Sequence, residues 1–157
     1  MPRYLSWLRV INLAVAILAV LAPLAHVLEL PNKLSLDADL WLAVQQHLYR
    51  GWGPLIGAPT EIGGLATSAA LAYVRRRHRF ALSMTLIACV GYGGMLVSFF
   101  ILNSPVNLAV SSWTTTNMPP DWPEYRLRWE LGHATACILS VVSLTSLITA
   151  YRRERLS

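Results

Sequence analysis

Four long apolar runs, separated by more polar stretches, dominate the pattern of this sequence. They extend from about residues 5 to 30, 55 to 74, 80 to 102 and 129 to 150. An apolar helix needs about 20 residues to cross a lipid bilayer, and each run is close to that length. The pattern therefore predicts an all-α fold in which residues 1–157 form one domain, a four-helix transmembrane bundle.

The composition supports a membrane protein. The chain is 55% hydrophobic and only 13% charged, whereas soluble domains carry about 25% charged residues. We expect an integral protein of a bacterial plasma membrane, whose surroundings are the lipid bilayer. An alternative for the first run is a signal peptide, because two arginines, an apolar run and the letters LAPLA follow one another there.

The basic residues predict the orientation of the bundle. The two chain ends and residues 75–79 together hold nine basic residues and one acid, a net charge of +8. The connections on the other side hold four basic residues and seven acids, a net charge of −3. Lys and Arg remain on the cytoplasmic side of membranes, so we expect both termini to be cytoplasmic. Short basic clusters beside apolar runs also argue against nucleic acid as a partner, and the sequence does not define an oligomeric state.

Two outer loops connect the runs on the less basic side. The first, residues 31–54, has five residues at helical spacing: Leu36, Leu40, Val44, His47 and Leu48. We expect a short amphipathic helix that lies at the membrane interface or folds over the bundle. The second, residues 103–127, is rich in Pro, Thr, Asn and Trp, which predicts an irregular lid.

Polar residues gather at the outer ends of all four runs. They are two histidines, three acids and two asparagines: His26, Glu29, Glu61, Asn103, Asn107, Glu130 and His133. Ionisable residues in membrane helices usually face a bundle interior or a cavity, so the pattern predicts a buried polar pocket. The alternative is purely structural, because side chains near the interface can reach water and an acid is favourable at a helix N-terminus.

One chemistry for such a pocket is metal binding. Glu130 and His133 have the Glu-x-x-His spacing of carboxylate-bridged dimetal bundles, and His26 and Glu29 have the reversed order. Glu61 would be a further carboxylate ligand. The third run offers only amides, so the dimetal pattern is incomplete. These five residues are the candidate ligands of a divalent metal.

The other chemistry is acid–base catalysis on a hydrophobic substrate. A buried carboxylate beside a histidine can remove a proton from an acidic carbon. We expect the more buried of Glu130 and Glu61 to be the base, with His133 sharing the proton and Asn107 donating to the oxyanion. His26 and Glu29 complete the catalytic set. Candidate substrate-binding residues are Trp113, Trp129, Asn103 and His47, although a membrane-interface belt also accounts for each tryptophan.

Several short motifs, in their order along the chain, resemble a known family. The motifs are ELPNKL, YRGWGP with GAPTEIG, PVN at residues 105–107, and RWELGH at residues 128–133. They resemble the DUF1772 family of small four-span membrane proteins, which includes anthrone oxygenase-like proteins of aromatic polyketide pathways. The resemblance implies oxygenation of an anthrone-like carbon by molecular oxygen without a bound cofactor. It points to Asn107, Trp129 and His133, and also to Trp113 after the PVN motif.

Other functions stay open beside this one. They are isomerisation or cyclisation of a terpenoid or another lipid-soluble intermediate, metal-dependent oxidation in the same pocket, and a non-catalytic subunit or ligand-binding protein. For the bundle itself we expect small residues at the helix contacts: Gly63, Gly64, Ala66 and Ala70 in the second run, and Gly91, Gly93 and Gly94 in the third.

Overall fold

The chain is entirely helical over the part that the structure describes. The computed structural model describes residues 3–156, and their side chains as far as residue 153. The helices are α1 Arg3–Leu28, α2 Leu30–Leu34, α3 Ala38–Ala43, α4 Ala58–Val74, α5 Arg79–Ser98, α6 Ser104–Ser111 and α7 Trp122–Leu156. Three π-helical turns lie among them: η1 Val44–Leu48, η2 Gly53–Gly57 and η3 Phe99–Asn103. No strand occurs in these residues, so the all-α prediction is confirmed.

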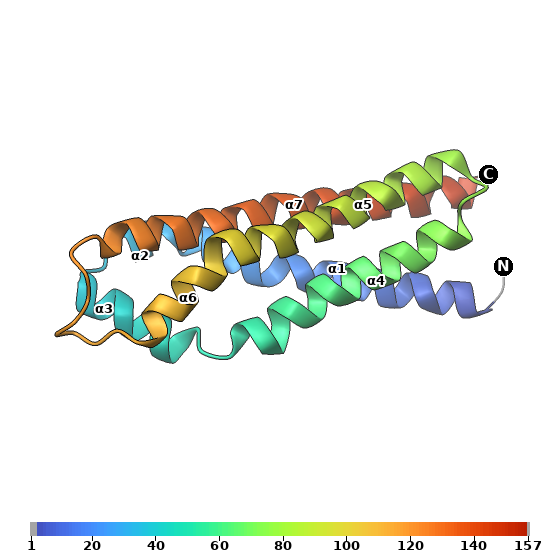
Figure 1. Cartoon of the computed structure of the whole chain (residues 1–157). Coiled ribbons are helices and arrows are strands. Elements are labelled where there is room, and N and C mark those ends of the chain that lie inside the picture. The colour runs from blue at the N-terminus through green and yellow to red at the C-terminus, as the bar shows by residue number, and fades with distance from the viewer. Residues whose placement is uncertain (1–2, 157) are drawn as a thin grey trace.

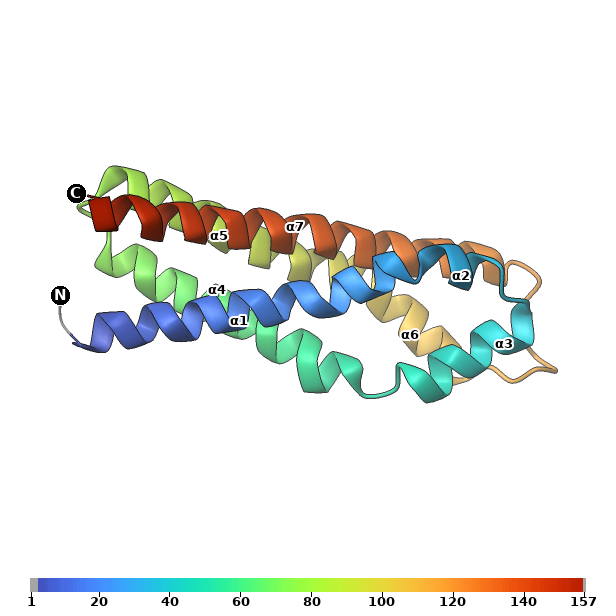
Figure 2. The ribbon, with the colours of Figure 1, turned by 180° about the vertical axis from the view of Figure 1, so that it is seen from behind.

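The four long helices α1, α4, α5 and α7 form an elongated bundle. Helices α5 and α7 run side by side along most of their length, and α1 and α4 complete the bundle (Figures 1 and 2). Both chain termini and the α4–α5 connection lie at one end, here called the terminal end. The short helices α2, α3 and α6 lie at the opposite end, here called the site end (Figure 1).

Three helical segments are long and apolar enough to cross a membrane. They are Arg3–Leu28, Arg79–Ser111 and Trp122–Arg153. Their outward faces carry large apolar side chains, such as Val90 with 74% and Ile138 with 65% of its surface exposed. An apolar surface of this extent suits lipid rather than water. Helix α4 has 17 residues and is shorter than these segments.

Small residues bring the helices together, as predicted, but only at some of the expected positions. Three glycines closely approach a side chain of a neighbouring helix: Gly64 meets Tyr92, Gly91 meets Ser143 and Gly94 meets Leu139. A side chain at Gly64 or Gly91 would collide with its neighbour. The expectation is wrong for Ala66 and Ala70, which are exposed, and Gly93 has no neighbour that a methyl group would touch.

The first outer loop contains short helices, but their buried face differs from the prediction. Asp37 caps α3 by accepting a hydrogen bond of 2.9 Å from the backbone N–H of Leu40. Trp41 and Leu42 are buried, whereas the side chains of Leu40 and Leu48 are exposed. Asp37 is extended and begins α3, so Leu36 and Leu40 do not lie on one continuous helix, and the π geometry of η1 changes the spacing again from Val44 onwards. An unbroken helical spacing therefore selected the wrong face.

The second outer loop is more regular than its composition indicates. Helix α6 continues α5 through the turn η3, and only residues 112–121 lie outside helices. Pro105 lies in the first turn of α6, where the missing N–H is tolerated. The chain bends between α5 and α6 (Figure 1), which directs α6 towards the first outer loop. The prediction of an irregular lid is therefore wrong for residues 104–111.

Candidate functional site

A cluster of aromatic rings and imidazoles lies at the site end, with His26 at its centre. The ring centroid of His26 lies 4.0 Å from that of His133 and 4.9 Å from that of Trp129. Tyr49 approaches the same imidazole edge-on at 4.6 Å. Only 3% of His26 is exposed, and its Nδ1 atom has no hydrogen-bond partner among the residues that the structure describes. Two positive imidazoles this close would repel each other strongly, so the histidine pair can hold at most one extra proton.

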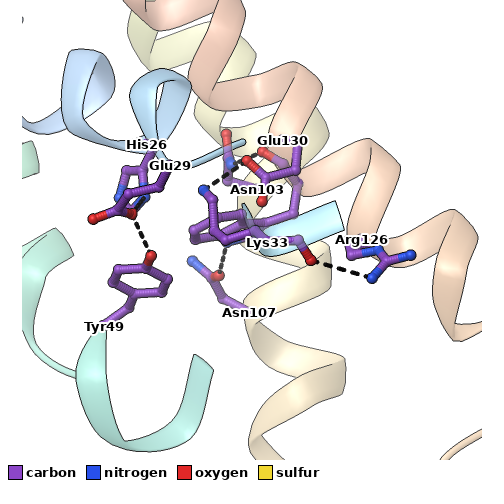
Figure 3. Close-up of polar contacts among 9 residues, drawn as sticks. His26, Glu29, Lys33, Tyr49, Asn103, Asn107, Arg126 and Glu130 are labelled. Carbon is purple, nitrogen blue, oxygen red and sulfur yellow. Dashed lines mark hydrogen bonds and ion pairs between the residues drawn. The ribbon is translucent and has the colours of Figure 1, made fainter. Parts of the chain in front are cut away.

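Glu130 is paired with a lysine rather than exposed to the cavity. The Nζ atom of Lys33 donates a hydrogen bond of 2.8 Å to Oε2 of Glu130, and both side chains are about 4% exposed (Figure 3). The other carboxylate oxygen, Oε1, is buried, and no group in the described part of the chain bonds it. Such a pair is sensitive to the loss of either member, because the remaining charge would then be buried alone.

The surroundings of Lys33 hold it at this position. Its ammonium group lies 4.9 Å from the ring centroid of Trp129 and 5.7 Å from that of Tyr49. Arg126 of α7 donates to the backbone carbonyls of Lys33 at 3.3 Å and Leu36 at 2.9 Å. These contacts fasten α2 to α7, so the first outer loop closes the site end of the bundle.

Tyr49 connects the aromatic cluster to the outer surface. Its hydroxyl donates a short hydrogen bond to the carboxylate of Glu29, as Figure 3 shows. Burial, followed by that hydrogen bond, raises the pKa of Tyr49 above its ordinary value, so the phenol stays protonated at neutral pH. The carboxylate of Glu29 is 44% exposed and lies 3.8 Å from Nδ1 of His26. Glu29 therefore links the buried histidine to the exposed surface of the site end.

Two asparagines hold Trp129 from opposite ends. Nδ2 of Asn103 donates 2.9 Å to the backbone carbonyl of Trp129, and Nε1 of Trp129 donates 2.9 Å to Oδ1 of Asn107. Asn103 is buried at the end of η3, where it packs directly on Gly132 of α7. A methyl group at position 132 would occupy the place of the Asn103 side chain. The glycine of the RWELGH motif is thus required by this contact.

A small, partly open cavity, with a volume of about 50 Å³, adjoins the aromatic cluster at His133. Its polar lining comprises Glu61, His133, Asn103 and Thr60. The apolar lining includes Pro23, which has no N–H to donate to the carbonyl of Ala19, another lining residue. No cation or hydrogen-bond donor pairs with Glu61 among the residues that the structure describes. The cavity therefore combines a carboxyl group, an imidazole and an amide in apolar surroundings.

The structure brings most of the predicted site residues to one end but gives them different neighbours. Glu130 and His133 both point into the bundle, as predicted, yet only His133 lines the cavity. Asn107 contacts Trp129 instead of the cavity. Trp113 packs with Trp41, Val106 and Val110 in an apolar cluster that also includes Trp129, and it does not line the cavity. The side chain of His47 is exposed.

The five candidate metal ligands are not gathered around one point. Within the described residues, no three His, Cys, Asp or Glu side chains lie close enough together to hold a metal ion. His26 and His133 are adjacent, but Glu130 binds Lys33 and Glu29 binds Tyr49. Metal dependence of the reaction stays a prediction that metal analysis of the purified protein can test.

Sequence reasoning missed Lys33, Tyr49 and Trp52. One signal for Lys33 was present: it is the only lysine in a chain whose other twelve basic residues are arginines. A compact ammonium pairs well with a single buried carboxylate, unlike a wide guanidinium. Tyr49 and Trp52 lie in the YRGW stretch, and nothing in the hydrophobic pattern distinguishes them from the membrane-interface belt.

Known proteins add no assignment to this geometry. No protein-family model matches the chain, and no match was found among curated proteins or solved structures. The resemblance drawn from the short motifs is therefore neither supported nor excluded, and the site has to be interpreted from its own geometry.

Proposed function

We propose that all four long helices cross the membrane, with both termini cytoplasmic and the site end at the outer leaflet. The common end of the termini and the charge difference between the two sides support this orientation. Helix α4 and the preceding turn η2 together extend from Gly53 to Val74, which is long enough for a span. In a bacterial cell the membrane would be the plasma membrane.

We further propose that the protein is a membrane enzyme that performs acid–base chemistry on a hydrophobic small molecule. One observation carries this proposal: Glu61 and His133, from two different helices, line one small cavity in an apolar bundle. An acid and an imidazole at such a place are costly for stability and are typical of functional sites. Glu61 is the better candidate for the base, because Glu130 is held by Lys33.

The chemistry would begin with removal of a proton from an acidic carbon or hydroxyl of the substrate. Glu61 or His133 takes the proton, and the second histidine, His26, lies close enough to His133 to share it. The side chain of Asn103 lines the same cavity, and its amide N–H group can donate a hydrogen bond to the developing oxyanion. Glu29, beside His26, then exchanges the proton with the outer solvent.

The motif resemblance favours oxygenation as the overall reaction. The anion of an anthrone can transfer electrons to molecular oxygen, which needs no bound cofactor. The balance is one anthrone and one O₂ giving one anthraquinone and one water. The carbon loses two hydrogens and gains one oxygen atom, and the second oxygen atom leaves as water.

Unsubstituted anthrone is a suitable probe, because proton removal and oxygenation can be measured separately. Under nitrogen in D₂O, the protein should accelerate deuterium exchange at the acidic methylene of anthrone. In air it should accelerate oxygen uptake and anthraquinone formation above the protein-free rate. His133→Ala and Glu61→Gln should each lower both rates by roughly a hundredfold, the usual contribution of a general acid or base.

Matched controls come from residues far from the cavity. His78→Ala at the terminal end and Glu124→Gln at the exposed start of α7 remove the same chemical groups and should leave both rates unchanged. Exchange without oxygen uptake would support acid–base catalysis but overturn oxygenation. Wild-type rates equal to the protein-free rates, or site variants equal to wild type, would overturn the enzymatic proposal for this substrate class.

A further inference from the structure

An apolar groove lies directly beside the cavity, between α1 and the segment that leads into α4. It has a volume of about 370 Å³ and is open on one side. Its walls include Leu18, Leu21 and Ala25 of α1, and Trp52 and Leu55 near η2. The leucines of α1 belong to a segment that is apolar enough to span the membrane, so the groove opens towards lipid.

The groove and the cavity share one thin wall. Ala22 and Thr60 line both spaces. The hydroxyl of Thr60 donates to the backbone carbonyls of Ile56 at 2.7 Å and Gly57 at 3.0 Å, so its hydrogen-bonding capacity is used within its own helix. A methyl group at Gly57 would meet nothing closer than 3.9 Å, so close packing does not require this glycine. Small side chains therefore separate the two spaces, and a modest displacement would join them.

The two volumes suit different parts of one molecule. About 50 Å³ accommodates only a few atoms, whereas the groove falls within the roughly 300–1,000 Å³ of sites for small organic ligands. No charged side chain lines the groove. In the cavity, Glu61 would repel an anionic head group, while His133 and Asn103 can bond a neutral hydroxyl or carbonyl group. A phosphate or carboxylate head group is therefore disfavoured.

From these features we infer that the groove is a lateral substrate site for a neutral amphiphile. Its hydroxyl or carbonyl head enters the cavity past Ala22 and Thr60, and its apolar body stays in the groove after entry from the lipid. This inference rests on the proposed function and defines the substrate class more narrowly. A substrate would have a small polar head and a large apolar remainder, which explains how so small a cavity serves a hydrophobic molecule.

The test uses phenol, 4-butylphenol and 4-octylphenol as probes of increasing apolar length. Binding is measured on purified full-length protein in detergent. The quantity compared is the probe concentration that gives half of the maximal rise in melting temperature. Wild type should bind 4-octylphenol at least tenfold more tightly than phenol, because each methylene group buried in the groove strengthens binding. Ala22→Phe and, independently, Thr60→Leu should reduce this preference at least fivefold.

Ala14→Phe is the matched control, since Ala14 lies on the same helix α1 but is exposed outside the groove. This variant should retain the wild-type preference for 4-octylphenol over phenol. Comparison with it corrects for partition of the probes into detergent. Two groove variants are used so that, if one does not fold, the other still decides. Equal chain-length preference in wild type, in the control and in a folded groove variant would mean that only detergent or bilayer lipid contacts the groove, and would overturn the inference.

Failure of this inference can be told apart from failure of the proposed function. Binding through the groove without any deuterium exchange on anthrone would overturn the enzymatic proposal and leave the groove as a binding site. If His133→Ala abolishes deuterium exchange, but Ala22→Phe and Thr60→Leu do not alter it, the groove inference would be overturned and the enzymatic proposal would be retained. Probe binding therefore decides the groove, and proton exchange decides the chemistry.

Discussion

The two ends of the bundle both contain buried polar groups, but they use them differently. At the terminal end, Asn12 of α1 donates to Thr67 at 2.8 Å and to Ser68 at 3.0 Å, both on α4. Tyr151 of α7 donates its hydroxyl to the side-chain oxygen of Asn12. Three helices are thus joined by hydrogen bonds among neutral side chains, the arrangement that stabilises membrane bundles.

The terminal end also buries the charged side chain of Arg75, which donates to the hydroxyl of Thr85 at 3.3 Å, but the site end buries an acid and a base together. Lys33 and Glu130 form this buried ion pair, and Nδ1 of His26 and Oε1 of Glu130 have no hydrogen-bond partner among the described residues. Two imidazoles lie in contact beside a cavity that a carboxyl group also lines. Buried groups of this kind reduce stability unless a ligand or water completes their bonding. The comparison favours a stabilising role for the terminal end and supports the proposed chemistry at the site end.

The largest effect is expected from breaking the ion pair of the site end. Lys33→Met should lower the free energy of unfolding by about 3–5 kcal/mol, because Glu130 would remain charged and buried alone. Adding Glu130→Leu should restore most of that loss. Unfolding in a denaturing detergent, followed by circular dichroism, measures both. A double variant no more stable than Lys33→Met would show that the pair is not the cause.

A smaller effect should follow from filling the space beside Asn103. Gly132→Ala places a methyl group where the Asn103 side chain lies, and overpacking of this kind costs about 1–3 kcal/mol. Asn103 would be displaced from Trp129 and from the cavity, so deuterium exchange on anthrone should fall more than the melting temperature. Gly93→Ala is the control, since a methyl group there meets no neighbour. Equal behaviour of the two variants would contradict the assigned contact.

The difference between the ends also explains which parts of the fold and of the site could be predicted from the sequence. Apolar runs locate the long helices because length and hydrophobicity are local properties of the chain. The clustering of ionisable residues at one end of the runs indicated that Glu130 and His133 point inward, and both lie inside the bundle. The helix contacts at Gly64 and Gly91 were predictable for a similar reason, since only small residues permit close approach.

Partners that are distant in sequence were not predictable. Lys33 and Glu130 belong to different elements, and charge counting placed both on the same side without pairing them. The buried face of the first outer loop lies on Trp41 and Leu42, because α3 starts anew after the extended Asp37, a break that an unbroken helical spacing does not contain. The groove depends on α1 and η2 lying together, which only the three-dimensional fold defines.

At the terminal end, Asn12→Ala tests the stabilising half of the comparison. It removes the centre of the network and leaves the hydroxyl of Tyr151 without this acceptor. Interhelical hydrogen bonds in membranes contribute little individually, so the expected loss of unfolding free energy is about 1–2 kcal/mol. Anthrone exchange at the folded temperature should stay at the wild-type rate. A large fall in exchange with unchanged stability would mean that the ends are not separate in function.

The smallest effect at neutral pH is expected from Tyr49→Phe. The variant removes one hydrogen bond to Glu29, and the expected loss is about 1 kcal/mol of unfolding free energy. The pH dependence is more informative, because burial and the Glu29 carboxylate raise the pKa of Tyr49 in the folded state. Below about pH 10, the ordinary pKa of tyrosine, the phenol is protonated in both the folded and the unfolded state. Tyr49 then makes its full contribution to the free energy of unfolding.

Above about pH 10 the unfolded chain loses the Tyr49 proton while the folded protein keeps it, so the unfolded state is favoured increasingly. The wild type should therefore lose stability with rising pH more steeply than Tyr49→Phe, by at most the contribution of one proton. The free energy of unfolding is measured between pH 8 and about 11 for both proteins. The other tyrosines are present in both, so the difference between the two curves reports Tyr49 alone. Tyr4→Phe is the control, because Tyr4 is exposed on α1 at the terminal end. Parallel pH curves for wild type and Tyr49→Phe would show that Tyr49 titrates normally, and that the site end does not bury this hydroxyl against Glu29.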